Sequence, residues 1–230
     1  MSGGLLFILA LIPAIILHEL AHGYVAHLLG DETAKIAGRL TLNPLKHIDP
    51  VGSIAVPLIL AVGQMATLGR VEFLYGWAKP VPINPMNLRL NGIANPRRLM
   101  AVVALAGPMM NFALAIFAGL AVHVVHTNGM LDFLAYFIEI NLLLGLFNLI
   151  PLPPMDGGRI AVGVLPLPLA VALAGAERYG ILLVLLLLFV LPTVLGQFGI
   201  AFDPFQEAVA RILPWAERIV LIITGNQVGN

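Results

Sequence analysis

The sequence predicts an all-α, polytopic membrane protein, a helical bundle of about four to five membrane helices plus one re-entrant or interfacial segment. Of its 230 residues, 60% are hydrophobic and only 10% are charged, and the mean hydropathy is +0.97. Soluble domains carry about 25% charged residues, and disordered chains combine low hydrophobicity with high charge, so both classes are excluded. The formal net charge of +0 gives no basic surface, and we expect no nucleic-acid partner.

The membrane helices are predicted from runs of about 20 mostly apolar residues, the length that crosses a bilayer. The first run covers residues 4–29, and the next, residues 51–68, is shorter and contains Pro57. Lys and Arg residues around this second run place both of its ends on one side of the membrane. Because it is too short to cross twice, we expect it to be re-entrant or interfacial. Residues 69–98 are rich in charge and proline, and we expect a loop there.

The second half of the chain predicts a helical hairpin and two further helices. Residues 99–125 carry no charge, and only a short turn separates them from the apolar residues 131–150. The hairpin and the turn that follows it occupy residues 99–159. Residues 181–195 form another apolar run, whereas residues 204–223 alternate apolar and charged side chains at helical spacing. That pattern is typical of a helix that lies in the membrane interface.

A short polar motif interrupts the first predicted helix. Residues 18–22 read His-Glu-Leu-Ala-His, and a helix places His18 and His22 on one face, about 6 Å apart along its axis. Two imidazoles in this arrangement can bind one zinc ion, and Glu19 beside them can accept a proton from water. Ionisable groups at membrane depth are unfavourable unless compensated, and a dication compensates for all three. A polar helix end without metal is the alternative interpretation.

A catalytic zinc site needs a third protein ligand. Because the chain has no cysteine, that ligand must be nitrogen or oxygen, and the nearby carboxylates are Asp132, Glu139 and Asp156. Asp156 follows three prolines and precedes two glycines, so it lies on a turn close to membrane depth. Irregular backbone at that depth is tolerated only inside protein or against a water-filled cavity. We therefore predict Asp156 as the third ligand, against the simpler interpretation of a turn aspartate.

Three segments share their pattern with one known family. They are HELAH at 18–22, AGPMMN at 106–111 and NLIPLPPMDGGR at 148–159. Together they resemble the site-2 protease family of intramembrane zinc metalloproteases, over roughly residues 11–159. The length leaves no room for the PDZ or CBS domain of larger members. We therefore expect a compact member, a single membrane-embedded metalloprotease domain over residues 1–230.

The resemblance implies roles for individual residues. It makes His18, His22 and Asp156 the ligands of one zinc ion per chain, and Glu19 the catalytic base. It also matches Asn148 to a family asparagine near the metal that helps to hold the substrate or its oxyanion. An ordinary hydrogen bond between helices is the alternative role for Asn148.

The resemblance also implies an activity, a zinc-dependent endopeptidase that hydrolyses peptide bonds within or next to transmembrane segments. The expected partners are transmembrane protein substrates and the lipid bilayer, and the expected location is the plasma membrane of a prokaryote. The alternative function is that of a metal-binding membrane protein, such as a transporter or an inactive homologue, without proteolysis. Transporters often contain inverted repeats, and the sequence shows none.

Overall fold

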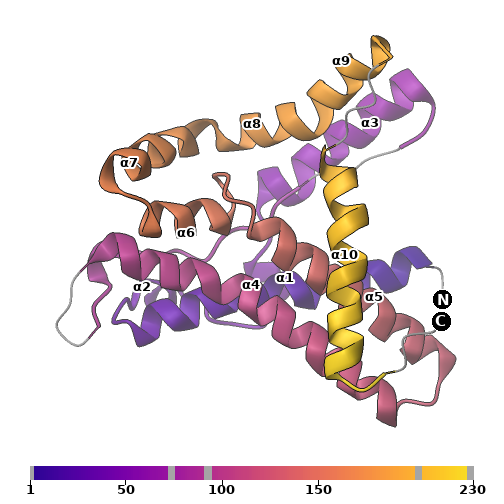
Figure 1. Ribbon diagram of the computed structural model, residues 1–230, viewed down its shortest axis with the longest axis horizontal. Coiled ribbons are helices and arrows are strands. Elements are labelled where there is room, and N and C mark those ends of the chain that lie inside the picture. Colours follow the sequence, from indigo (N-terminus) through magenta and orange to yellow (C-terminus); the bar gives the residue numbers. More distant parts are fainter. Residues whose placement is uncertain (1–2, 72–75, 91–94, 200–203, 227–230) are drawn as a thin grey trace.

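The computed structural model describes residues 3–71, 76–90, 95–199 and 204–226, and the elements it contains are helices (Figure 1). Three of them are long and apolar enough to cross a membrane. They are α1 (Gly3–Leu28), α4 (Pro96–Ala121, extended by the 3₁₀ turn η4, Val122–Val124) and α5 (Asn128–Asn148). The predicted all-helical, multi-pass fold class is confirmed, with three candidate spans.

The three candidate spans pack pairwise against one another and form the core of the molecule (Figure 1). Small side chains allow close approach, because Ala10 and Ala14 of α1 are fully buried against Ile140 of α5. At the other end of α1, Ala26 packs against Val103 of α4. This packing holds the polar motif of α1 against α4.

α4 begins earlier than the sequence predicted. The side chain of Asn95 accepts a hydrogen bond from the backbone N–H of Arg98, and Pro96 occupies the first helical turn. An N-terminal cap followed by proline is a strong helix start, and it draws two arginines into the first turn despite their charge. The described residues of the predicted loop before Asn95 are irregular apart from the turn η3 (Pro85–Asn87).

A tight turn after α5 returns the chain along α4. α6 (Asp156–Val164) packs on α4 and starts at the aspartate singled out by the sequence. A Cβ added to Gly157 would lie 2.3 Å from the carbonyl oxygens of Leu149 and Ile150, so only glycine fits here. The turn therefore fixes Asp156 at the start of α6, facing the core.

Between α6 and the C-terminal helix, the helices are short and extend away from the bundle (Figure 1). The predicted segment 181–195 is helical and lies in one uninterrupted run of helical backbone, whose middle turn is π-helical. The elements after α6 are α7 (Leu167–Ala176), η5 (Glu177–Tyr179), α8 (Gly180–Leu185), the π-helical η6 (Leu186–Val190) and α9 (Leu191–Gln197).

The predicted re-entrant or interfacial segment 51–68 is also helical. It comprises the π-helical η2 (Pro50–Ala55) and α3 (Val56–Leu68), and its apolar part is shorter than the three candidate spans. Its position in the membrane stays a prediction. Two further short elements precede it, α2 (Thr33–Ile36) and η1 (Pro44–Lys46).

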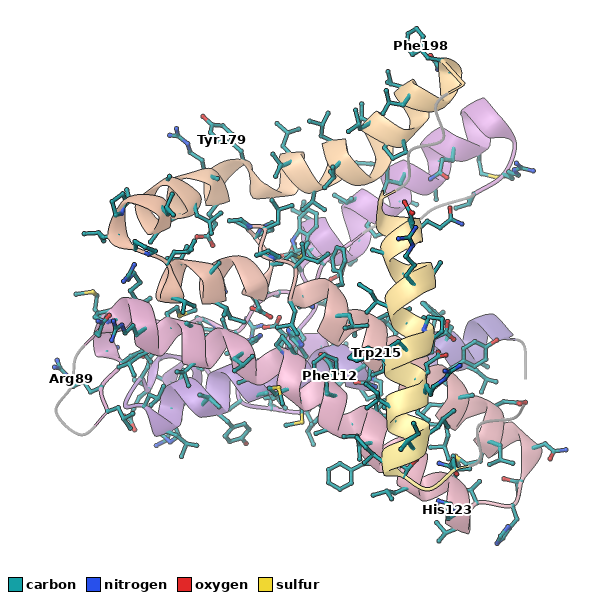
Figure 2. The ribbon with its side chains drawn as sticks, viewed as in Figure 1. Arg89, Phe112, His123, Tyr179, Phe198 and Trp215 are labelled. Atoms are coloured by element: carbon teal, nitrogen blue, oxygen red, sulfur yellow. The ribbon has the colours of Figure 1, made fainter. Side chains whose placement is uncertain are left out.

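The C-terminal helix α10 (Pro204–Ile223) crosses α4 and α5 in Figure 1 and packs on both. Its Ala216 and Val220 are buried against Ala115 and Leu142. Figure 2 shows Phe112, which packs against this cluster, beside the helix. The amphipathic pattern is thus used for packing on the hairpin, and the interfacial location of α10 stays a prediction.

Candidate metal centre

The structure brings together the three residues predicted as metal ligands. Nε2 of His18 and Nε2 of His22 each lie 3.1 Å from Oδ2 of Asp156, and the two nitrogens are 3.1 Å apart. All three residues are buried, with at most 7% of their surface exposed. The two histidines project from α1 and the aspartate from the start of α6. Three ligand atoms thus form a nearly equilateral triangle.

This donor set fits zinc. Zinc bonds imidazole nitrogen and carboxylate oxygen at about 2.0–2.2 Å, so tetrahedral ligand atoms lie about 3.3–3.5 Å apart. The observed separations of 3.1 Å are close to that spacing. Among the described residues, this is the group of histidine and acidic side chains that could hold a metal ion. Three protein ligands also match the composition of catalytic rather than structural zinc sites.

The second ring nitrogen of each histidine contacts an acceptor on α4. Nδ1 of His22 donates to the backbone carbonyl of Val103 at 2.7 Å, and Nδ1 of His18 contacts Oδ1 of Asn111 at 2.5 Å. Hydrogen bonds of this kind fix the orientation of ligand imidazoles and keep Nε2 available to the metal. α4 therefore orients both rings although it supplies no ligand.

Gly107 gives the two rings the space that they occupy. A Cβ at this position would lie 2.4 Å from Nε2 of His22 and 2.6 Å from Nε2 of His18. Any side chain here would therefore displace the rings or fill the space between the ligand atoms. Sequence reasoning missed this role, because a glycine in an apolar helix gives no indication of what faces it.

Glu19, the predicted base, is half-buried next to the triangle and has one fixed contact. Its Oε2 accepts a hydrogen bond from the backbone N–H of Val81 at 2.8 Å. Among the described residues, Oε1 of Glu19 has no hydrogen-bond partner. The carboxylate is thus oriented through one oxygen, and the other is available to a water molecule.

The segment that carries Val81 is held in place by a buried carboxylate just beyond the end of α1. Asp31 is fully buried and accepts hydrogen bonds from Asn84 N at 2.7 Å and Asn87 Nδ2 at 3.0 Å. It also accepts bonds from the backbone and the hydroxyl of Thr33. Burial alone would raise the pKa of Asp31, but these hydrogen bonds outweigh it and lower the pKa below its usual value.

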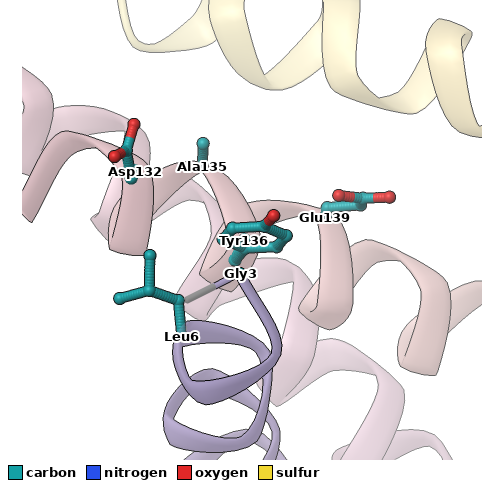
Figure 3. Close-up of a pocket in the computed structure, with 6 residues that line it drawn as sticks. All are labelled: Gly3, Leu6, Asp132, Ala135, Tyr136 and Glu139. Atoms are coloured by element: carbon teal, nitrogen blue, oxygen red, sulfur yellow. The ribbon is translucent and has the colours of Figure 1, made fainter. Parts of the chain in front are cut away.

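The other predicted candidates lie outside the triangle. Asn148 is partly buried and donates to the carbonyl of Leu144 on its own helix at 3.0 Å. Among the described contacts, none joins Asn148 to the ligands, so its catalytic role stays a prediction. Asp132 and Glu139 instead line a separate cavity of about 510 Å³, between α5 and the start of α1 (Figure 3). They are not brought to the metal centre.

Comparison with known proteins identifies the family. Residues 120–191 match the model of "Peptidase family M50". The chain is 41% identical over 201 residues to the "Putative zinc metalloprotease YwhC" of Bacillus subtilis. The aligned residues cover 83% of this chain and 82% of that protein. The chain belongs to peptidase family M50. This M50 protein is thus a zinc metalloprotease, and the resemblance to site-2 proteases is confirmed.

Two mycobacterial relatives of this M50 protein are more distant. The "Putative zinc metalloprotease Rip2" of Mycobacterium tuberculosis is 31% identical over 190 residues, 79% of this chain and 65% of that protein. The Rip2 of Mycolicibacterium smegmatis is 32% identical over 193 residues, 80% of this chain and 66% of that protein. No solved structure matches the chain significantly.

Proposed function

We propose that this M50 protein is an intramembrane endopeptidase that uses one zinc ion to cut peptide bonds within or next to transmembrane segments. The observation that carries the proposal is the buried triangle of His18, His22 and Asp156, two of which lie on a candidate membrane span. Glu19 lies one residue from the first ligand, where a proton acceptor for hydrolysis is needed.

In the proposed reaction, Glu19 accepts a proton from the attacking water and passes it to the leaving amine. Zinc, when bound, lowers the pKa of water to about 7 and polarises the scissile carbonyl. Oε2 of Glu19 is occupied by the Val81 N–H, so the free Oε1 carries the proton. The backbone bond keeps the carboxylate oriented while its charge changes.

The proposed substrates are transmembrane proteins, reached from the lipid bilayer. A substrate helix hides its carbonyl groups in internal hydrogen bonds, so it must unwind locally before attack. The irregular backbone near Pro80–Pro85 lies beside Glu19 and could hold such a segment in an extended form. The bacterial origin of the relatives supports location in the plasma membrane of a prokaryote.

Replacing Glu19 by glutamine tests the proposal. Glu19→Gln should keep one zinc ion per chain and lose cleavage by about 10²–10⁴-fold, because an amide cannot accept the proton. The assay uses purified protein in proteoliposomes with a panel of single-span substrates, and mass spectrometry of the fragments places the cut. Glu32→Gln, at an exposed carboxylate paired with Lys35, is the matched control.

Two results would count against the proposal. Cleavage by Glu19→Gln at the wild-type rate would remove Glu19 from the reaction. A wild-type protein that holds zinc and cuts none of the substrates would favour metal binding without proteolysis.

A further inference from the structure

Two buried asparagines connect the metal centre to the hairpin. Asn111 of α4 and Asn141 of α5 have no exposed surface. Nδ2 of Asn141 donates to the carbonyl of Phe137 at 2.8 Å, and Oδ1 of Asn141 accepts from Nδ2 of Asn111, also at 2.8 Å. Oδ1 of Asn111 then lies 2.5 Å from Nδ1 of His18. A single hydrogen-bonded chain thus runs from the backbone of α5 to a ligand on α1.

The orientation of both asparagine amides is determined by the Phe137 carbonyl, at the end of the hydrogen-bonded chain that is farthest from His18. A backbone carbonyl can only accept, so the Phe137 oxygen requires the NH₂ end of Asn141 to face it. The oxygen of Asn141 must then face Asn111 and accept from its NH₂ group. The carbonyl of Ala14, 3.4 Å from Nδ2 of Asn111, favours the same orientation of that amide.

The orientation of the Asn111 amide determines which nitrogen of His18 carries the hydrogen. With its amide oriented in this way, Asn111 presents only an acceptor to His18, so Nδ1 of that imidazole must carry the hydrogen. A neutral imidazole with hydrogen on Nδ1 has its lone pair on Nε2, the atom that points at Asp156. His22 needs no such chain, because the Val103 carbonyl contacts its Nδ1 directly.

We infer that Asn111 and Asn141 are positioning residues that select the metal-binding tautomer of His18. This inference rests on the proposed zinc site. Asn141 touches no ligand, and it acts through the orientation that it gives to the Asn111 amide. Without Asn141, that amide can rotate and present NH₂ to His18, which favours the tautomer whose Nε2 carries hydrogen and cannot bind metal.

A double-mutant cycle on zinc affinity tests the inference. Asn141→Leu should weaken zinc binding by about 10–100-fold, as for other residues that orient metal ligands. A carboxylate at position 111 can accept from His18 through either oxygen, so it does not need Asn141 to orient it. Asn141→Leu should therefore cost less than about threefold in affinity when it is combined with Asn111→Asp. Zinc affinity is measured by chelator competition in detergent, and the absorption spectrum of the cobalt-substituted protein gives a second readout.

The matched control is Leu142→Ala. Leu142 is buried beside Asn141 on α5, so this change lowers stability without touching the amides. It should leave zinc affinity unchanged. A merely structural role of Asn141 would instead make Asn141→Leu and Leu142→Ala behave alike, and would give no rescue by Asn111→Asp.

Several outcomes would overturn the inference. Wild-type affinity in Asn141→Leu would do so, and so would equal weakening by Asn141→Leu in both backgrounds. If Asn141→Leu does not fold, the pair Asn111→Asp and Asn111→Leu carries the test. The aspartate must then bind zinc at least about tenfold more tightly than the leucine, and equal affinity overturns the inference. A wild-type protein that binds no zinc would instead refute the proposed function, so the two failures are distinguishable.

Discussion

The metal centre and the pocket of Figure 3 each contain ionisable side chains, and α1 contributes residues to both. In the metal centre three ligand atoms lie 3.1 Å apart and the residues are buried. In the pocket, Asp132 is exposed and Glu139 half-exposed, and Figure 3 shows their carboxylates pointing away from each other. Ionisable groups in a candidate span therefore do not by themselves make a metal site.

Burial explains the difference. A buried carboxylate such as Asp156 is unfavourable unless opposite charge or hydrogen bonds compensate for it. An exposed one such as Asp132 needs no specific partner. The metal centre also has a second layer on α4, in which the Val103 carbonyl and Asn111 hold the rings. The pocket contains no histidine, and its other lining residues are Gly3, Leu6, Ala135 and Tyr136.

The largest expected effect breaks the metal centre itself. His22→Ala combined with Asp156→Ala should reduce bound zinc from about one ion to below about a tenth of an ion per chain, because two of three ligands are lost. Metal analysis of the purified protein measures this directly. Full zinc occupancy in the double mutant would refute the ligand set.

Asn148→Ala tests whether Asn148, at the end of α5, takes part in the reaction at the metal centre. If its amide donates to the substrate oxyanion, cleavage should fall by about 10²–10³-fold with zinc content unchanged. If it serves only its bond to the Leu144 carbonyl of its own helix, the loss should be about 0.5–1.5 kcal/mol of stability. Thermal stability and turnover per zinc-loaded molecule are measured together. A destabilised variant with normal turnover would remove Asn148 from the site.

Gly107→Ala tests the space that the rings require. A methyl group within 2.6 Å of both Nε2 atoms should weaken zinc binding by about 10–100-fold. Alanine normally stabilises a helix by about 0.5–1 kcal/mol relative to glycine, so the expected loss of binding runs against helix propensity. Gly129→Ala in α5, where a Cβ meets nothing within 4 Å, is the control. Unchanged zinc affinity in Gly107→Ala would contradict the role of this glycine.

The buried carboxylate of Asp31 predicts a pH dependence of stability. Its pKa is lowered in the folded protein, so its contribution is fully present above the unfolded pKa of about 3.9 and is lost as pH falls through the folded pKa. Asp31→Asn should lower stability by about 1–3 kcal/mol at neutral pH, because an NH₂ group replaces one of the two acceptor oxygens and faces the donors that it served. Thermal unfolding from pH 7 to pH 3 should show the two proteins converging at the acid end. Parallel curves would contradict the assignment.

The smallest expected effect is at the acidic pocket. Asp132→Asn combined with Glu139→Gln should leave zinc content and cleavage within about twofold of wild type, because neither side chain lies at the metal centre. Metal analysis and the proteoliposome assay measure both quantities. A loss of zinc would show that the two clusters are coupled and that the comparison drawn above is wrong.

Much of the fold was predictable because apolar runs long enough to cross a bilayer predict membrane helices directly. Residues 4–29, 99–125 and 131–150 correspond to α1, α4 and α5. The start of α4 was missed because a local cap, Asn95, outweighed the charge of the arginines after it. Hydropathy also gives no sign of the π-helical turn η6 within residues 181–195.

The ligand atoms were predictable for a different reason. His18 and His22 are four residues apart on one helix, and Asp156 is marked by the prolines and glycines around it. Gly107 and Asn111 lie in the AGPMMN segment that carries the family resemblance, but neither they nor Asn141 carry a charge or a periodic signal that would indicate their contacts. Asn111 meets His18 across 93 residues of sequence, and spacing along one helix cannot reveal such a contact.

The separation of the ligands along the chain has a consequence for biosynthesis. His22 and Asp156 are 134 residues apart, so ribosomes that add about 5–20 residues per second need about 7–27 s between them. During that interval α1 enters the membrane with two of its three ligands, and the nascent chain has no complete centre. The zinc ligands of a newly made chain are therefore incomplete until Asp156 has been added.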